Sequence, residues 1–161
     1  TIRLLGAPES LISYFQSAAQ EEREHAEAFR KMIGIAGGVA AVVWPARQAA
    51  PILPAQIQSP ADLVDLIDAT LEEAIHMERS VAAPIATIVD RCKAATLSTE
   101  GALQFLTVEQ ISKELAPFVL EQVTAEQDLQ LLRQKIATLG AEPEWHDIFE
   151  ACDLFFAKKC D

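Results

Sequence analysis

Residues 11–32 read LISYFQSAAQEEREHAEAFRKM, and this stretch decides the fold class of the chain. Apolar side chains recur in it at alternating spacings of three and four residues, which is typical of a helix with one buried face. Two polar residues, Glu22 and His25, interrupt the apolar seam and share one helix face. A buried carboxylate is costly unless it is paired, so the stretch predicts a helix whose inner face carries chemistry.

Proline and glycine clusters divide the rest of the chain. Ser59 followed by Pro60 is typical of a helix N-terminus, and Gly140 is typical of a helix end. No strand-like alternation competes with the helical patterns. We therefore expect one all-α domain over residues 1–161, a bundle of three long helices with a long crossover loop and a short C-terminal helix. The expected bounds are 8–33, 60–95 and 102–139 for the long helices, 34–59 for the crossover loop, and 143–159 for the short helix.

Composition narrows the possible partners. The 161 residues include 13 Lys plus Arg against 24 Asp plus Glu, for a net charge of −11. A surface that binds nucleic acid needs basic residues, so nucleic acid is excluded as a partner. The longest apolar run, Val39 to Trp44, is far too short for a transmembrane segment. Metal cations and other copies of the chain remain as partners.

The three cysteines form no CxxC pair and no zinc-type spacing. They predict reduced thiols and an intracellular protein. The chain starts at Thr1 and its first methionine is Met32, which fits either a fragment or an organellar protein after removal of a targeting segment.

The second and third long helices also carry polar residues in their apolar seams. Glu78 interrupts the second seam, and Gln122 interrupts the third with Glu121 beside it. The apolar positions of the second seam include Leu71, Ile85 and Ile88, and those of the third include Leu115 and Leu129. Each has an ordinary explanation: Glu78 could pair with Arg79 or His76, and Gln122 could be a hydrogen-bonded core amide. The charged run around Glu22 could equally be a solvated helix face.

Taken together, these seam residues favour a metal site. Two carboxylates and an imidazole that meet at the same level of a bundle repel one another unless a cation lies between them. A Glu-x-x-His pair on one helix with carboxylates from facing helices is typical of di-iron sites in helical bundles.

Three segments resemble the ferritins. The run EEREHAE at residues 21–27, followed by Gly37-Gly38, is similar to the family's second-helix signature. The run EAIHMERSV at residues 73–81 is similar to the third-helix segment of animal-type ferritins, and FVLEQV at residues 118–123 resembles the fourth-helix segment. The resemblance extends from about Leu11 to Phe156.

The resemblance implies a di-iron ferroxidase that oxidises Fe(II) with oxygen, for iron storage or detoxification. Glu22 would bridge two irons, His25 would bind the first iron, and Glu78 would bind the second. These three would be the catalytic residues. Gln122 would lie beside the second iron and orient water or oxygen, and its neighbour Glu121 joins it in the expected metal-binding set.

The chain also departs from the family pattern. The ferritins' first helix supplies another carboxylate ligand, and no stretch before the signature has room for it. We therefore expect an apolar groove that another copy, a separately encoded helix or a different subunit fills, so ferroxidase activity depends on that completion. The alternative is a ferritin-derived structural subunit of a larger assembly that binds no iron. Glu109-Gln110 is a rival match to the fourth-helix motif.

Overall fold

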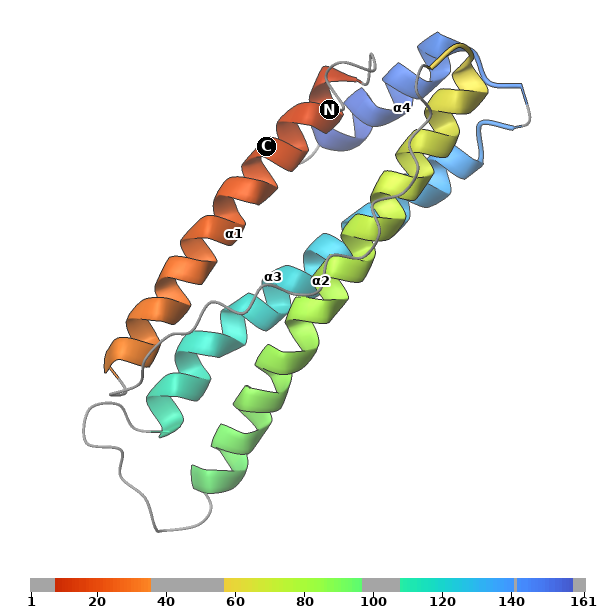
Figure 1. The fold of residues 1–161 in the computed structure, drawn as a ribbon. Coiled ribbons are helices and arrows are strands. Elements are labelled where there is room, and N and C mark those ends of the chain that lie inside the picture. The colour runs from red at the N-terminus through yellow and green to blue at the C-terminus, as the bar shows by residue number, and fades with distance from the viewer. Residues whose placement is uncertain (1–7, 36–56, 97–107, 141, 158–161) are drawn as a thin grey trace. The chain divides into compact units, whose positions relative to one another are not determined.

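The computed structural model describes residues 8–35, 57–96, 108–140 and 142–157, and all the regular structure in these ranges is helical. Helix α1 is Glu9–Ile35, α2 is Pro60–Thr96, α3 is Val108–Ala137 and the short α4 is Trp145–Ala157 (Figure 1). No strand occurs in the described ranges. The expected all-α architecture of three long helices and a short final one is confirmed.

Local sequence signals fix several helix ends. At the start of α2 the Ser59 hydroxyl accepts a hydrogen bond from the Asp62 amide at 3.2 Å, and Asp62 accepts from the Ser59 amide at 2.8 Å. These reciprocal bonds satisfy amide groups that a helix N-terminus leaves without partners. Beyond the end of α3, Gly140 has a φ of +89°, a conformation that glycine adopts without strain. Both signals were readable in the sequence.

The connections are only partly described. Helix α1 continues through Gly34 to Ile35, beyond the end expected at residue 33. Most of the expected crossover loop, residues 36–56, lies outside the described residues, as do residues 102–107 of the expected third helix. Pro84 and Pro117 lie inside α2 and α3, which continue on both sides of them.

The chain divides into two compact units. Within the described residues, the first unit comprises 8–20, 57–75 and 127–157, and the second comprises 21–35, 76–96 and 108–126. The three long helices each contribute residues to both units, whereas α4 belongs to the first unit alone.

The first unit has a continuous apolar core. Leu63, Leu71 and Leu132 are completely buried, and α4 adds Ile148 and Cys152, which are also completely buried. Tyr14 of α1 stacks on Phe156 of α4 with ring centroids 4.7 Å apart. The short helix therefore completes the core of this unit.

The second unit has a smaller core. Ile85 and Val89 of α2 and Leu115 of α3 are its buried apolar residues within the described ranges, and Phe29, Met32 and Phe118 are among the partly buried side chains packed against them. The apolar seam expected through Ile88 is shifted here, because Val89 is 4% exposed while Ile88 is 46% exposed.

None of the described helices is both long enough and apolar enough to cross a membrane.

Candidate metal site

The second unit contains all five expected site residues. Helix α1 supplies Glu22 and His25, α2 supplies Glu78, and α3 supplies Glu121 and Gln122. Three helices thus contribute polar side chains to one compact unit.

Gln122 is the buried polar residue of this site. It is 4% exposed, and its Nε2 donates a hydrogen bond to Glu22 Oε1 at 2.8 Å. Because a carboxylate only accepts, the NH₂ end of the amide must face Glu22. The amide oxygen Oε1 has no hydrogen-bond partner among the described residues, although it is fully buried. A buried acceptor without a partner is unusual and is a place where a cation or a water would be stabilised.

His25 lies between two carboxylates. Its Nε2 is 3.2 Å from Glu121 Oε2, and its Nδ1 is 3.7 Å from Glu22 Oε1. The imidazole and the Phe118 ring form a T-shaped contact, with centroids 4.8 Å apart and planes at 82°. With 19% of its side chain exposed, His25 is largely withdrawn from water. The ring is therefore held in a defined position by α3.

Glu78 is half-buried and forms no ion pair with any described residue. The cation next to it in sequence, Arg79, instead pairs with Glu126 at 2.8 Å, so the interpretation of Glu78 as the partner of Arg79 is wrong. The pKa of Glu78 rises from 4.5 to about 7. Burial is the largest cause, and the neighbouring carboxylates of Glu22, Glu21 and Glu126 add to it.

Glu22 departs from the buried position that the seam predicted. Its side chain is 46% exposed, although one oxygen is bound by Gln122. A cation approaching from solvent can therefore reach Glu22 without displacing core side chains.

The described residues resolve which glutamine reaches this site. Gln122 contacts Glu22, whereas Glu109 and Gln110 are both exposed on the first turn of α3. The Glu109-Gln110 segment therefore does not bring its amide to Glu22 in this structure.

The donors fit iron in kind but not in number. Carboxylate oxygens, an imidazole nitrogen and a free amide oxygen suit a transition-metal cation. Within the described residues, however, no group of three His, Cys, Asp or Glu side chains is placed to hold a metal ion. Glu22 and His25 are engaged with Gln122 and Glu121 instead. By themselves these residues form part of a site.

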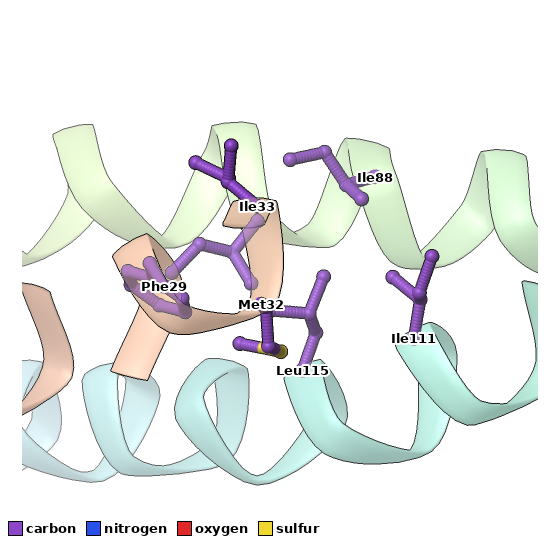
Figure 2. Close-up of a pocket in the computed structure, with 7 residues that line it drawn as sticks. Phe29, Met32, Ile33, Ile88, Ile111 and Leu115 are labelled. Carbon is purple, nitrogen blue, oxygen red and sulfur yellow. The ribbon is translucent and has the colours of Figure 1, made fainter. Parts of the chain in front are cut away.

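An apolar pocket of about 350 Å³ lies elsewhere in the same unit (Figure 2). Phe29, Met32 and Ile33 of α1, Ile85 and Ile88 of α2, and Ile111 and Leu115 of α3 line it. This lining offers no strong donor for a metal ion, so the polar residues around Glu22 remain the candidate site. Phe29 connects the two regions, because its ring is 4.8 Å from that of Phe118, which contacts His25.

Comparison with protein families matches residues 8–118 to the ferritin-like domain. The chain belongs to the ferritin-like family. No curated protein and no solved structure gave a significant match to it. The matched part of this ferritin-like chain includes Glu22, His25 and Glu78 and ends shortly before Glu121. The bundle architecture and the family resemblance inferred from the sequence are thus confirmed.

Sequence reasoning missed two features of the ferritin-like site. The motif at residues 118–123 includes Phe118 but does not reveal that its ring supports the His25 imidazole. Glu126 lies outside that motif, although it binds Arg79 and raises the pKa of Glu78. Its position one turn after Gln122 on α3 was the available signal, because residues four apart share a helix face.

Proposed function

We propose that this ferritin-like protein binds Fe(II) as its substrate and oxidises it with oxygen. Glu22, His25 and Glu78 bind the iron, Glu22 lies between the two metal positions, and Gln122 presents its free amide oxygen to water or oxygen beside them. Two Fe(II) ions each give one electron to one O₂ molecule, which takes up two protons to form hydrogen peroxide. The family's role in iron storage or detoxification follows from this chemistry.

The observation that carries this proposal is the carboxyl group of Glu78, which is half-buried and forms no ion pair with a described residue. Burial and the neighbouring carboxylates of Glu22, Glu21 and Glu126 raise the pKa of Glu78 to about 7. Such an arrangement costs folding free energy, and a cation would remove that cost by neutralising the carboxylates. The buried Gln122 oxygen supports the same conclusion, since it too lacks a hydrogen-bond partner among the described residues.

The site needs a further donor. No three acidic, thiol or imidazole groups of the described residues are placed around one ion. We therefore propose that a carboxylate from another polypeptide segment completes the site when the protein assembles as a homo-oligomer or in a larger complex. Assembly is a common property of ferritin-like domains. The net charge of −11 would help to attract Fe(II) to such an assembly.

The experiment is anaerobic addition of Fe(II) followed by air, with oxidation followed by near-ultraviolet absorbance. We expect rapid oxidation by the wild-type protein and a loss of at least about tenfold in rate for His25→Ala and Glu78→Gln. Glu114→Gln is the matched control, because Glu114 is an exposed acid on the same helix as Gln122. Native mass spectrometry of the same samples reports the assembled state.

A second candidate function is a structural subunit that binds no iron. It is favoured by the pairing of Glu22 with Gln122 and of His25 with Glu121, because these groups satisfy one another without an ion. If the assembled wild-type protein oxidises Fe(II) no faster than His25→Ala and Glu78→Gln, the structural function replaces the catalytic one.

A further inference from the structure

The apolar pocket of the second unit has a buried floor and an exposed mouth. Ile85 and Leu115 are 7% and 6% exposed, so they form the floor. Ile33 and Ile88 are 40% and 46% exposed, so they form the mouth. Side chains from all three long helices thus line one space that a small molecule can enter from solvent (Figure 2).

The wall of the pocket on α1 is held in place by aromatic packing. Phe29 lines the pocket, and its ring packs against Phe118 of α3 with centroids 4.8 Å apart. Met32, three residues further along α1, has an unbranched side chain that can adjust to the shape of an occupant. A wall that is already ordered lowers the entropic cost of binding, and one adaptable side chain lets the pocket close around its ligand.

The height of the pocket sets the size of its occupant. On each helix the lining residues fall within at most five consecutive positions, 29–33 on α1, 85–88 on α2 and 111–115 on α3. At a rise of about 1.5 Å per residue, this is little more than one helical turn. A docked helix uses anchors over about two turns or more and is about 10 Å wide with its side chains. A space of about 350 Å³ is too short and too small to hold such a helix, but it fits a small molecule.

The lining also sets the chemistry of the occupant. It consists of isoleucine, leucine, methionine and phenylalanine side chains, none of which offers a charge or a strong hydrogen-bond donor. A polar group placed inside would lose its hydrogen bonds to water without replacement, which weakens binding. A dry apolar cavity of about 150 Å³ is large enough for benzene, so a pocket of about 350 Å³ has room for a substituted ring or a short branched chain.

We infer that this pocket is a binding site for an uncharged, hydrocarbon-like small molecule, such as a substituted aromatic ring or a short aliphatic chain. The apolar body of the ligand rests on the floor formed by Ile85 and Leu115. Binding there uses none of the polar residues that the proposed function assigns to iron, so the two proposals stand or fall separately.

The test uses the two methionines of the sequence as internal reporters. Met32 lines the pocket, whereas Met77 is 54% exposed on α2 and is not part of the lining. In protein labelled with ¹³C at the methionine methyl groups, toluene is added at up to millimolar concentrations and NMR spectra are recorded. The Met32 signal should shift in a saturable way, because an aromatic ring bound beside the methyl group changes its local magnetic field. The Met77 signal should stay in place.

Two matched comparisons define the site and the class of ligand. Ile33→Trp adds a ring at the mouth and should weaken the binding of toluene at least about fivefold, because it fills space that the ligand needs. Leu120→Trp should leave binding unchanged, because Leu120 is 68% exposed on α3 and lies outside the lining. Phenol, which has the size of toluene but carries a hydroxyl group, should bind at least about fivefold more weakly than toluene.

Several results would overturn the inference. If the Met32 signal ignores toluene but moves with protein concentration, a second copy covers the pocket; if it responds to neither, the chain itself fills the pocket. Equal shifts of Met32 and Met77, or an unchanged response in Ile33→Trp, would place toluene elsewhere on the protein. Equal affinities for toluene and phenol would show that the ligand class is wrong.

Discussion

The two compact units of this protein use the same three long helices but fill their interiors differently. Among the described residues of the first unit, fourteen buried residues form one cluster, and the most enclosed of them, such as Leu63 and Leu132, have no exposed surface. In the second unit three buried apolar residues form the cluster within the described ranges, beside the buried amide of Gln122. Helix α4 explains part of the contrast, because it adds Ile148, Cys152 and Phe156 to the first core alone.

The two units also differ in how their charged side chains are paired. In the first unit Arg133 binds Asp68 through two nitrogens, at 2.6 and 2.9 Å, and also contacts Glu72 at 3.2 Å. No cation among the described residues of the second unit pairs with the half-buried Glu78. If the proposed function holds, the second unit tolerates this unfavourable carboxylate because it serves binding. Functional sites commonly carry such local conflicts.

The largest effect should come from the apolar cores. Leu132→Ala should lower the free energy of unfolding by about 2–5 kcal/mol, because it leaves a cavity in place of a completely buried side chain. Leu115→Ala should cost about 2 kcal/mol, at the low end of that range, because Leu115 already borders a pocket. Urea unfolding followed by circular dichroism measures both, with Leu120→Ala, whose side chain is 68% exposed, as the control. Equal losses of unfolding free energy in Leu132→Ala and Leu115→Ala would contradict the inferred difference between the two cores.

The cysteines provide a second test. Cys152 is completely buried in the first unit, and burial raises the pKa of its thiol to about 12. Cys92 of the second unit is partly exposed. In a Cys160→Ser background, Cys92 should react with a thiol-specific disulfide reagent at least about a hundredfold faster than Cys152, since reaction needs an accessible thiolate. Mass spectrometry of the labelled peptides separates the two, and similar rates would show that the first unit opens as readily as the second.

Removing the charge of Glu78 should stabilise the metal-free protein. The pKa of this carboxyl is raised from 4.5 to about 7 in the fold, so its ionisation opposes folding. The penalty is absent below about pH 4.5, grows as the pH rises toward 7 and is complete above it. Glu78→Gln should therefore gain about 1–2 kcal/mol at about pH 8, discounted for the exposed half of the side chain, and almost nothing at about pH 4.

Urea unfolding of Glu78→Gln at both pH values measures this difference. The same substitution should reduce Fe(II) oxidation, so stability and activity move in opposite directions. A variant less stable than wild type at the higher pH would show that Glu78 has a favourable partner, and the contrast with the paired charges around Arg133 would disappear.

The smallest effect on stability should come from the pocket of the second unit. Ile88 lines this pocket and is 46% exposed. Ile88→Glu should therefore change the free energy of unfolding by no more than about 0.5 kcal/mol. It should nevertheless lower the fluorescence of bound anilinonaphthalene sulfonate at least about twofold, because that dye reports exposed apolar surface. The control is Leu154→Glu in α4, where an exposed leucine of the first unit is replaced. Equal quenching by both variants would show that the pocket is not the dye site.

Much of the fold could be predicted from local patterns. The three-and-four spacing of apolar residues predicted the long helices, and Ser59 and Gly140 predicted two of their ends. The inward positions of Leu71, Leu115 and Leu129 also followed from the spacing. The shift from Ile88 to Val89 could not be predicted, because a seam allows a step of either three or four residues and only the partner helix selects one.

The site could be predicted in part, since each of its polar residues interrupts an apolar seam. Which groups pair with one another could not be predicted. Arg79 had Glu78 as its neighbour in sequence but binds Glu126, and Glu121 could have faced iron but faces His25 Nε2. A helix places its own residues by spacing, whereas contacts between helices depend on how the helices are rotated and staggered against each other.

The amino-acid sequence alone determined that the chain is helical, acidic and related to the ferritins, because periodicity, charge and short motifs are properties of neighbouring residues. Tertiary structure decided that the second unit keeps an apolar pocket and that Gln122 rather than Gln110 binds Glu22. It also decided that no cation of the described residues pairs with Glu78. Those outcomes depend on which atoms of distant segments meet, and a carboxylate's free energy changes with each neighbour it gains or loses.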